Sequence, residues 1–227
     1  CSVRRQRQMC IRDRAEPQPE ELENQAKEAE YFALENQSVD QVQSASSAYS
    51  KTKIHLSATN GFNGGYSKTS FSTSCVAIAR SQSGLERDYD GDVRIFKRDL
   101  RSPEEIGIQA AKRAVSKLEA RKPKTGVYPV IFDERVSSSL IGHLLAATNG
   151  VAVAKGSSWL LNRKGTQVLP EFLSITEDPY RKRASGSRPF DAEGLETKAR
   201  KIVENGVLCD WTTCLLYTSD AADERNS

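Results

Sequence analysis

The two histidines of the chain, His55 and His143, limit the metal chemistry that the sequence allows. A zinc site of the HExxH kind needs two histidines one turn apart on a single helix, and these two lie far apart in the sequence. His55 falls on the polar face of an expected strand, which favours a solvent-exposed side chain. His143 falls on an apolar helical stripe, where a buried, hydrogen-bonded histidine is more common than a metal ligand. The residues by themselves assign neither histidine a catalytic or metal-binding role.

The two cysteines of the central region, Cys75 and Cys209, are the candidate nucleophiles. A reactive thiolate needs a helix N-terminus or a basic partner nearby, and the sequence around them provides neither. Both are therefore predicted to be small core residues. Two cysteines are also too few for a disulfide framework in a chain of this size, which indicates a reducing compartment.

Three short runs could bind ions. The glycine-rich run at 61–65 lacks the GK[ST] ending and the following helix of a phosphate-binding loop, so we predict a turn. The acidic run at 86–92 puts alternate carboxylates on one strand face, but it lacks EF-hand spacing, so a solvated face is favoured over a cation site. The basic run at 181–183 could contact phosphate, although solubilising charges in a loop are the commoner case. The four carboxylates of the acidic run are Glu86, Asp88, Asp90 and Asp92.

The overall charge and hydropathy exclude two classes of protein. The 227 residues include 33 basic and 30 acidic side chains, a net charge of +3, which is too balanced for a dedicated nucleic-acid binder. The longest apolar-leaning stretch, 136–154, is interrupted by serine, glycine, histidine and asparagine, so it is not expected to span a bilayer. We expect no direct contact with nucleic acid and no membrane insertion.

The two ends of the chain differ from the rest. Residues 1–14 (CSVRRQRQMCIRDR) and 214–227 (CLLYTSDAADERNS) resemble translated sequencing-adapter readthrough and are interpreted as non-native flanks, the alternative being genuine termini. The flanks hold Cys1, Cys10, Cys214 and the single methionine, Met9. The remaining core is therefore interpreted as an internal piece of a longer protein.

Periodicity predicts an α+β domain over residues 15–120. Residues 17–36 have helical spacing, and three strands at 48–58, 66–80 and 85–96 form an antiparallel meander joined by turns at 60–61, 63–65 and 81–84. A capping box at Ser102 with Pro103 starts a second helix. The apolar stripe of that helix, expected to lie on the meander, is Ile108, Ala111, Val115 and Leu118.

A charged linker, RKPKTG at 121–126, precedes a second domain predicted for 127–213. A short strand is expected at 127–132, followed by a helix that Asp133 caps and that ends at Asn149 and Gly150. A loop with possible short strands follows at 151–170, and a long ordered loop at 177–194. Residues 198–211 form a hairpin around Asn205 and Gly206. The fold class is α+β: an antiparallel meander with packed helices, then the start of a second, truncated β-rich α+β domain.

The order of three motifs identifies a family resemblance. They are SPEEIGIQAAKRAVSKLEARKPKTGVYPVIF, SSLIGHLLAATNGVAVAKGSSWL and SGSRPFDAEGLETKARKIVENGVL, and residues 17–211 resemble the TldD/PmbA family, in particular its PmbA (TldE) branch. The resemblance implies the family's central domain and the beginning of its C-terminal domain. It also implies a cytosolic, heterodimeric zinc metalloprotease that cleaves peptides or unfolded segments. An older family label is modulator of DNA gyrase.

The TldD branch carries an HExxxH helix, with two zinc-ligand histidines and a glutamate general base, where this chain has SSLIGH. Only His143 matches, because Ser138 and Ser139 stand at the first two positions. Serine replaces neither an imidazole ligand nor the glutamate that deprotonates a zinc-bound water. The resemblance therefore implies no catalytic, cofactor-binding or metal residue in this chain. Zinc is expected in a TldD-like catalytic partner subunit, with peptides or unfolded proteins as substrates.

Two other interpretations stay open from the sequence. One is an active metallopeptidase whose remaining ligands lie beyond Trp211, although the missing glutamate argues against it. The other is a regulatory protein-binding module of the gyrase-modulator type that acts without proteolysis. The near-neutral core argues against direct DNA contact but not against protein contact.

Overall fold

The computed structural model of the protein describes residues 11–13, 16–82 and 84–213, which divide between two structural units. Unit 1 comprises residues up to Lys124 together with Tyr180–Thr197, and unit 2 comprises Thr125–Pro179 and the residues from Lys198 onward. The boundary at Lys124 lies within the predicted linker. Cys1, Met9, Cys10 and Cys214, and most of both predicted flanks, lie outside the described residues.

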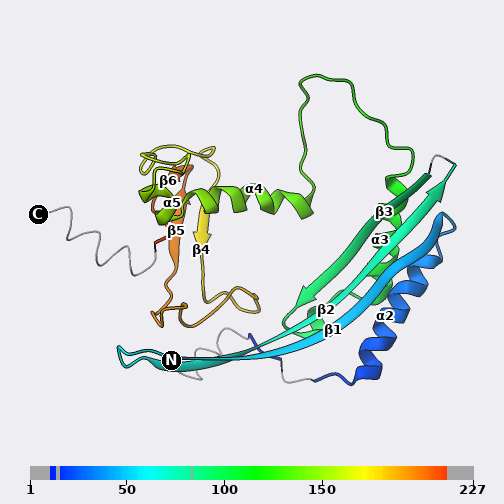
Figure 1. Ribbon diagram of the computed structural model, residues 1–227, viewed down its shortest axis with the longest axis horizontal. Helices are drawn as coiled ribbons and strands as arrows, with labels where there is room; N and C mark the ends of the chain where they lie inside the picture. The colour runs from blue at the N-terminus through cyan, green and yellow to red at the C-terminus, as the bar shows by residue number, and fades with distance from the viewer. Residues whose placement is uncertain (1–10, 14–15, 83, 214–227) are drawn as a thin grey trace, which may run out of the picture. The chain divides into compact units, whose positions relative to one another are not determined.

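Three antiparallel strands form the sheet of unit 1, as predicted. They are β1 (Val39–Ser57), β2 (Asn63–Ser81) and β3 (Gly84–Arg94), in the order β1-β2-β3 (Figure 1). β1 begins nine residues before the predicted strand because its serine- and glutamine-rich start, which lacks apolar alternation, pairs with β2. The predicted turn at 63–65 is wrong: these residues begin β2, and the chain turns at 58–62, where the Ala58 N–H donates to the Phe62 carbonyl at 2.9 Å.

The predicted inner face of β2 is confirmed. Phe71, Thr73, Cys75 and Ala77 alternate along the strand and are all buried. Helices α2 (Pro19–Leu34) and α3 (Pro103–Ser116) pack on the sheet, with Ala29 and Ala33 of α2 in the shared core. The capping box is also confirmed, because the Glu105 N–H donates to Ser102 Oγ and the Ser102 N–H donates to Glu105 Oε2.

The buried face of α3 differs from the predicted stripe. Ile106, Gly107, Ala110, Ala111 and Ala114 are buried, whereas Ile108, Val115 and Leu118 are only partly buried. Small residues occupy this face because α2 lies directly against it: a Cβ on Gly107 would be 2.2 Å from the Ala29 carbonyl oxygen. Periodicity weighted towards large apolar residues therefore missed the true contact face.

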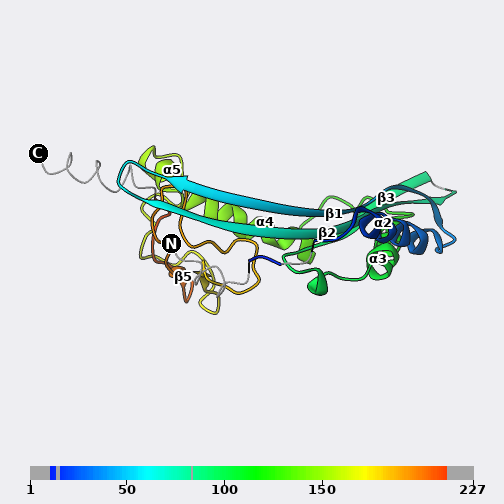
Figure 2. The same ribbon diagram turned by 90° about the horizontal axis from the view of Figure 1, so that it is seen from below.

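β1 and β2 continue as a two-stranded arm after β3 ends (Figure 2). Arg94 at the end of β3 pairs with Phe71, whereas β1 and β2 stay paired as far as Ser57 and Asn63. At the free side of this arm the Thr69 N–H donates to the Ile11 carbonyl at 3.2 Å, and Ile11 is buried beside Ile95. Ile11 and Asp13 of the predicted flank thus contact β2 and the residues after β3 within unit 1. A single 3-10 turn, η1 (Lys97–Asp99), follows β3.

Burial makes Cys75 a poor nucleophile. Desolvation raises the pKa of its thiol to about 11, with further contributions from Glu30 and Asp90. The ordinary value is 9.0, so the folded chain should hold about 100-fold less Cys75 thiolate at pH 8. We expect iodoacetamide to alkylate Cys75 at least about 100-fold more slowly in the folded chain than in urea, as measured by peptide mass spectrometry. Equal rates would contradict the buried position.

Unit 2 is a small α+β assembly. It contains α4 (Glu134–Ala147), α5 (Gly150–Ala154) and a three-stranded antiparallel sheet in the order β4-β5-β6. The strands are β4 (Ile175–Glu177), β5 (Arg200–Glu204) and β6 (Val207–Leu208). Its core is formed by Leu144, Ala147, Leu160, Ile202, Val203 and Leu208.

The local signals of unit 2 are confirmed, and the non-local ones are not. Asp133 caps α4, and β5 and β6 form the predicted hairpin, with φ of 47° at Asn205 and 79° at Gly206. The predicted strand at 127–132 is wrong: the segment pairs with no strand in the described chain, and its apolar side chains are exposed. α4 ends at Ala147 with Thr148 as its C-cap, before the predicted stop, and Asn149 caps α5, most of which lies in the predicted loop. No helix in the described residues is long and apolar enough to cross a bilayer.

Candidate functional site

The SSLIGH run lies in the middle of α4. The helix begins at Glu134, where the Arg135 N–H donates to Asp133 Oδ1 at 3.0 Å. Helical geometry places Ser139 and His143 one turn apart on the same side, with Ser138 five positions before the histidine. A helix can place two metal-binding side chains one turn apart, so the side chains at these positions of α4 decide whether it can bind zinc.

The serines of α4 do not fit a zinc site. Ser139 Oγ donates to the Val136 carbonyl at 2.5 Å, and Ser137 Oγ donates to the Glu134 carbonyl at 3.0 Å. These hydroxyls are bonded within their own helix, as serines in helices often are. A neutral hydroxyl in this state neither binds zinc as imidazole does nor accepts a proton as glutamate does. The residues present therefore do not fit a catalytic zinc ion.

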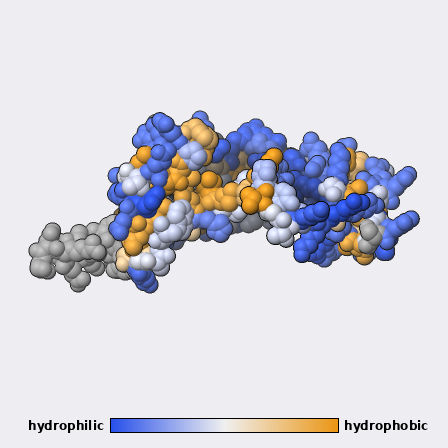
Figure 3. Space-filling view, turned by 90° about the horizontal axis from the view of Figure 1, so that it is seen from above, coloured by the Kyte–Doolittle hydropathy of each residue, from blue (hydrophilic) through white to orange (hydrophobic). Residues whose placement is uncertain are grey.

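His143 is exposed, so its predicted burial is wrong. α4 turns only Leu144 and Ala147 into the unit 2 core, and its other apolar side chains, such as Val136 and Leu140, also face outward. Figure 3 shows hydrophobic residues, coloured orange, on the surface of unit 2. Across residues 11–13, 16–82 and 84–213, no three histidine, cysteine, aspartate or glutamate side chains gather as a potential metal site.

Of the remaining predictions for single residues, some are confirmed and others are wrong. His55 is exposed on β1, which confirms its predicted solvent position. Cys209 is only half-buried, contrary to its predicted core position, because it follows directly after the end of β6. Of the run at 61–65, Gly61 lies in the turn with φ of 86°, whereas Gly64 and Gly65 belong to β2. Neither cysteine has a geometry that points to catalysis.

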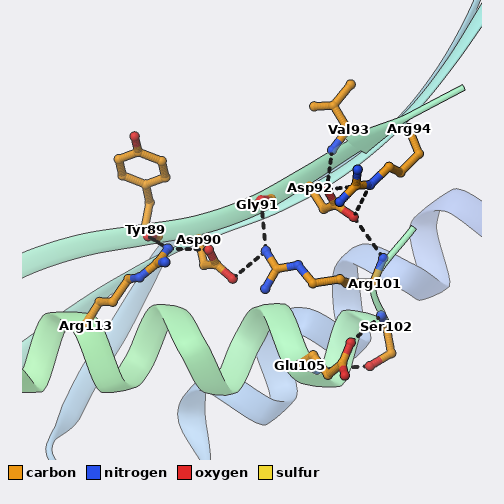
Figure 4. A network of polar contacts seen from close by, with 10 residues as sticks. All are labelled: Tyr89, Asp90, Gly91, Asp92, Val93, Arg94, Arg101, Ser102, Glu105 and Arg113. Atoms are coloured by element: carbon orange, nitrogen blue, oxygen red, sulfur yellow. Dashed lines mark hydrogen bonds and ion pairs between the residues drawn. The ribbon is translucent and has the colours of Figure 1, made fainter. Parts of the chain in front are cut away.

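Two carboxylates of the acidic run of β3, Asp88 and Asp90, are buried, and Glu86 and Asp92 are partly buried, which contradicts the predicted solvated face. Figure 4 shows Asp90 between two arginines. Asp90 forms ion pairs with Arg113 and with Arg101, whose guanidinium lies 2.8 Å from Asp90 Oδ2 but outside hydrogen-bond geometry. The whole Asp90 residue is only 3% exposed. The sequence prediction failed because α3 covers this face and brings its own cations.

The neighbouring carboxylates are bonded in the same way. Lys117 lies 3.1 Å from Asp88, and Asp92 accepts from the Arg101 N–H at 3.0 Å and from the Arg94 side chain. Burial opposes ionisation of Asp92, but these hydrogen bonds outweigh it and lower its pKa. Arg113 of α3 and Lys117, the C-cap residue of that helix, are four residues apart, a spacing that could have indicated a basic face for these acids. The network joins β3 to α3 and the residues that flank this helix.

The basic run at 181–183 lies in the part of the loop that belongs to unit 1. Arg183 forms an ion pair with Asp99, and its guanidinium lies 4.4 Å from the centre of the Phe96 ring. Arg181 and Lys182 line a pocket of about 280 Å³, here called the basic pocket. The sequence prediction of merely solubilising charges is incomplete, because it could not place the loop against the sheet.

Comparison with known families covers most of the chain. The description "PmbA/TldA metallopeptidase central domain" matches residues 12–118, and "PmbA/TldA metallopeptidase C-terminal domain" matches residues 125–224. The metalloprotease PmbA of Escherichia coli O157:H7 is 39% identical over 152 residues, which are 67% of this chain and 34% of that protein. A zinc metalloprotease TldD homolog of Saccharolobus solfataricus is 34% identical over 113 residues, 48% of this chain and 24% of that protein.

A solved structure shares the fold. A Thermotoga maritima protein described as a modulator of a DNA gyrase superposes with a TM-score of 0.84 at 26% identity, covering 91% of this chain and 48% of that one. The chain thus spans about a third of the length of the curated relative PmbA and about half of the solved structure. Both halves of the described fold, the meander with its helices and the second small sheet, match the family's central and C-terminal domains. This chain belongs to the PmbA/TldD metallopeptidase family.

Proposed function

We propose that this chain is part of a non-catalytic, PmbA/TldE-type subunit of a zinc-dependent metallopeptidase complex. A TldD-like partner holds the zinc ion and the general base in this proposal, and the complex cleaves peptides or unfolded segments in the cytoplasm. This chain contributes a partner surface rather than catalytic residues.

The observation that carries the proposal is the chemistry of α4. The positions that correspond to the histidine and glutamate of HExxxH are Ser138 and Ser139, and the Ser139 hydroxyl is bonded to the Val136 carbonyl. Removing the glutamate removes the group that deprotonates a zinc-bound water, which metal-assisted hydrolysis requires. The TldD homolog of Saccharolobus solfataricus is named a zinc metalloprotease, which supports zinc in a related subunit.

The test compares three samples of the full-length parent protein: alone, with its TldD-like partner, and with a partner whose HExxxH glutamate is replaced by glutamine. Peptide cleavage and zinc content are measured in each. We expect cleavage only with the intact partner, because only that subunit supplies the base. The glutamine partner should lose at least about 100-fold in rate, as expected when a general base is removed.

A matched histidine pair sharpens the test. His143→Ala in this chain should leave cleavage rate and zinc content within about twofold, because Ser138 and Ser139 stand where HExxxH has the other histidine ligand and the glutamate base. Alanine at the corresponding partner histidine should abolish both. Zinc loss from His143→Ala, or cleavage by the parent alone, would overturn the proposal. An intact pair that cleaves no peptide would favour the regulatory module that the gyrase-modulator name suggests.

A further inference from the structure

The basic pocket is built where the sheet of unit 1 meets the loop that follows Tyr180. Thr69 and Ser70 of β2 line one side of the pocket, together with Arg94, the last residue of β3. Arg181, Lys182 and Arg183 approach from the loop. β3 ends at Arg94, which pairs with Phe71, so Thr69 and Ser70 lie just beyond the part of β2 that β3 covers.

The described lining of the basic pocket contains four basic side chains and no acidic one. Arg94 is neutralised by Asp92 at 3.0 Å, and Arg183 by Asp99. Arg181 and Lys182 form no ion pair with any carboxylate of the described chain. Two cations are thus left without a compensating anion at one pocket.

A third cation adds to the positive potential nearby. Lys68 of β2 donates from Nζ to the Ser185 carbonyl at 2.9 Å, at the edge of the same loop. Burial and the positive charge of Arg188 together lower the pKa of Lys68. Like charges gathered on one surface are mutually destabilising unless an anion joins them. The arrangement is therefore a candidate for anion binding.

The loop that carries Arg181 is held in place independently of any ligand. The buried Ser187 hydroxyl donates to the Arg181 carbonyl at 2.6 Å. Phe190 is buried against the rings of Phe62 and Tyr66, with centroid distances of 4.9 and 5.2 Å. The backbone that carries Arg181 and Lys182 is thus already ordered, which reduces the conformational entropy lost when a ligand binds.

We propose that the basic pocket binds an oxyanion, the phosphate or carboxylate group of a small ligand, through Arg181 and Lys182. The arginine fork suits two oxygens of such a group, and the lysine supplies a point charge. The Thr69 and Ser70 side of the pocket adds polar surface next to these charges. This inference does not rest on the proposed peptidase role, because no residue of α4 is among those that line the pocket.

The test is a titration of the full 227-residue chain by calorimetry at constant ionic strength. Inorganic phosphate and glutarate are titrated separately, with chloride replacing the ligand in blanks. We expect saturable binding of at least one of them. Binding of phosphate alone identifies a phosphate group, and binding of glutarate alone identifies a carboxylate. Arg181→Gln/Lys182→Gln should weaken the affinity at least tenfold, about 1.4 kcal/mol.

The matched control removes the same two residue types outside the pocket. Arg121→Gln/Lys122→Gln lowers the net charge equally but changes exposed residues of unit 1 that do not line the pocket. The control should bind like the unchanged chain, and both variants should keep its circular dichroism spectrum. No saturable binding of either ligand, or equal weakening in the two variants, would overturn the proposal.

Discussion

Gly107→Ala is expected to lower the free energy of unfolding of unit 1 by about 3 kcal/mol or more. The new Cβ would lie 2.2 Å from the Ala29 carbonyl oxygen and 3.1 Å from the Ala33 backbone nitrogen. Neither is the end of a flexible side chain, so α2 and α3 must move apart and open the core between them. The higher helix propensity of alanine returns only about 1 kcal/mol. Hydrogen exchange of α3 amides in the variant measures the loss.

Gly142→Ala is the matched control, because Gly142 is also helical but a Cβ there meets nothing within 4 Å. We expect it to be neutral or to stabilise unit 2 by up to about 1 kcal/mol. Trp159 and Trp211, the two tryptophans, both belong to unit 2, so their fluorescence in urea follows that unit. Similar changes in the two variants would show that α2 and α3 are not in close contact at Gly107.

Asp90→Ala is expected to cost about 3–5 kcal/mol, the range seen when one partner of a buried ion pair is removed. The substitution leaves Arg113, whose side chain is 16% exposed, without its carboxylate, and it also removes the partner of Arg101. The loss reflects the largely buried Arg113 guanidinium that stays behind more than the attraction in the intact pair. Urea denaturation followed by far-UV circular dichroism, with exchange of β3 amides, measures it.

An exposed ion pair of the same sheet is the control. Arg80 donates two hydrogen bonds of 2.8 Å to Asp40, and the Arg80 side chain is 57% exposed. Asp40→Ala should cost at most about 1 kcal/mol, because water and salt screen such a pair. Equal costs for Asp90→Ala and Asp40→Ala would mean that the Asp90 network is solvated, as the sequence pattern had indicated.

Local signals in the sequence predicted the structure best. The capping box at Ser102, the cap at Asp133 and the turn at Asn205 and Gly206 are all confirmed, because each depends on a few neighbouring residues. The alternation of β2 also predicted its inner face, since one side of that strand is buried continuously. The three-stranded meander followed from these signals and short connections.

Signals that depend on distant partners failed. The apolar segment at 127–132 has strand character, but a strand forms only with a paired neighbour, and none in the described chain pairs with it. His143 has helical spacing with apolar residues, yet only the end of α4 is covered by core. The acidic run of β3 has the alternation of a solvated face, but Asp88 and Asp90 are buried, where Arg113 of α3 and its C-cap Lys117 pair with them. Each of these predictions failed because it depended on which distant residues pair with a strand or pack against a face, and the local sequence pattern does not contain that information.

The sequence by itself determined the fold class, the family resemblance and the absence of the histidine and glutamate from the α4 motif, because residue type alone decides whether a side chain can bind zinc or accept a proton. Only the tertiary structure decided which charges are neutralised. It paired Asp90 with Arg101 and Arg113, and it left Arg181 and Lys182 in a pocket beside β2 without an ion pair to any carboxylate of the described residues. The physical reason is that electrostatic interactions depend on distance and burial, and packing sets both.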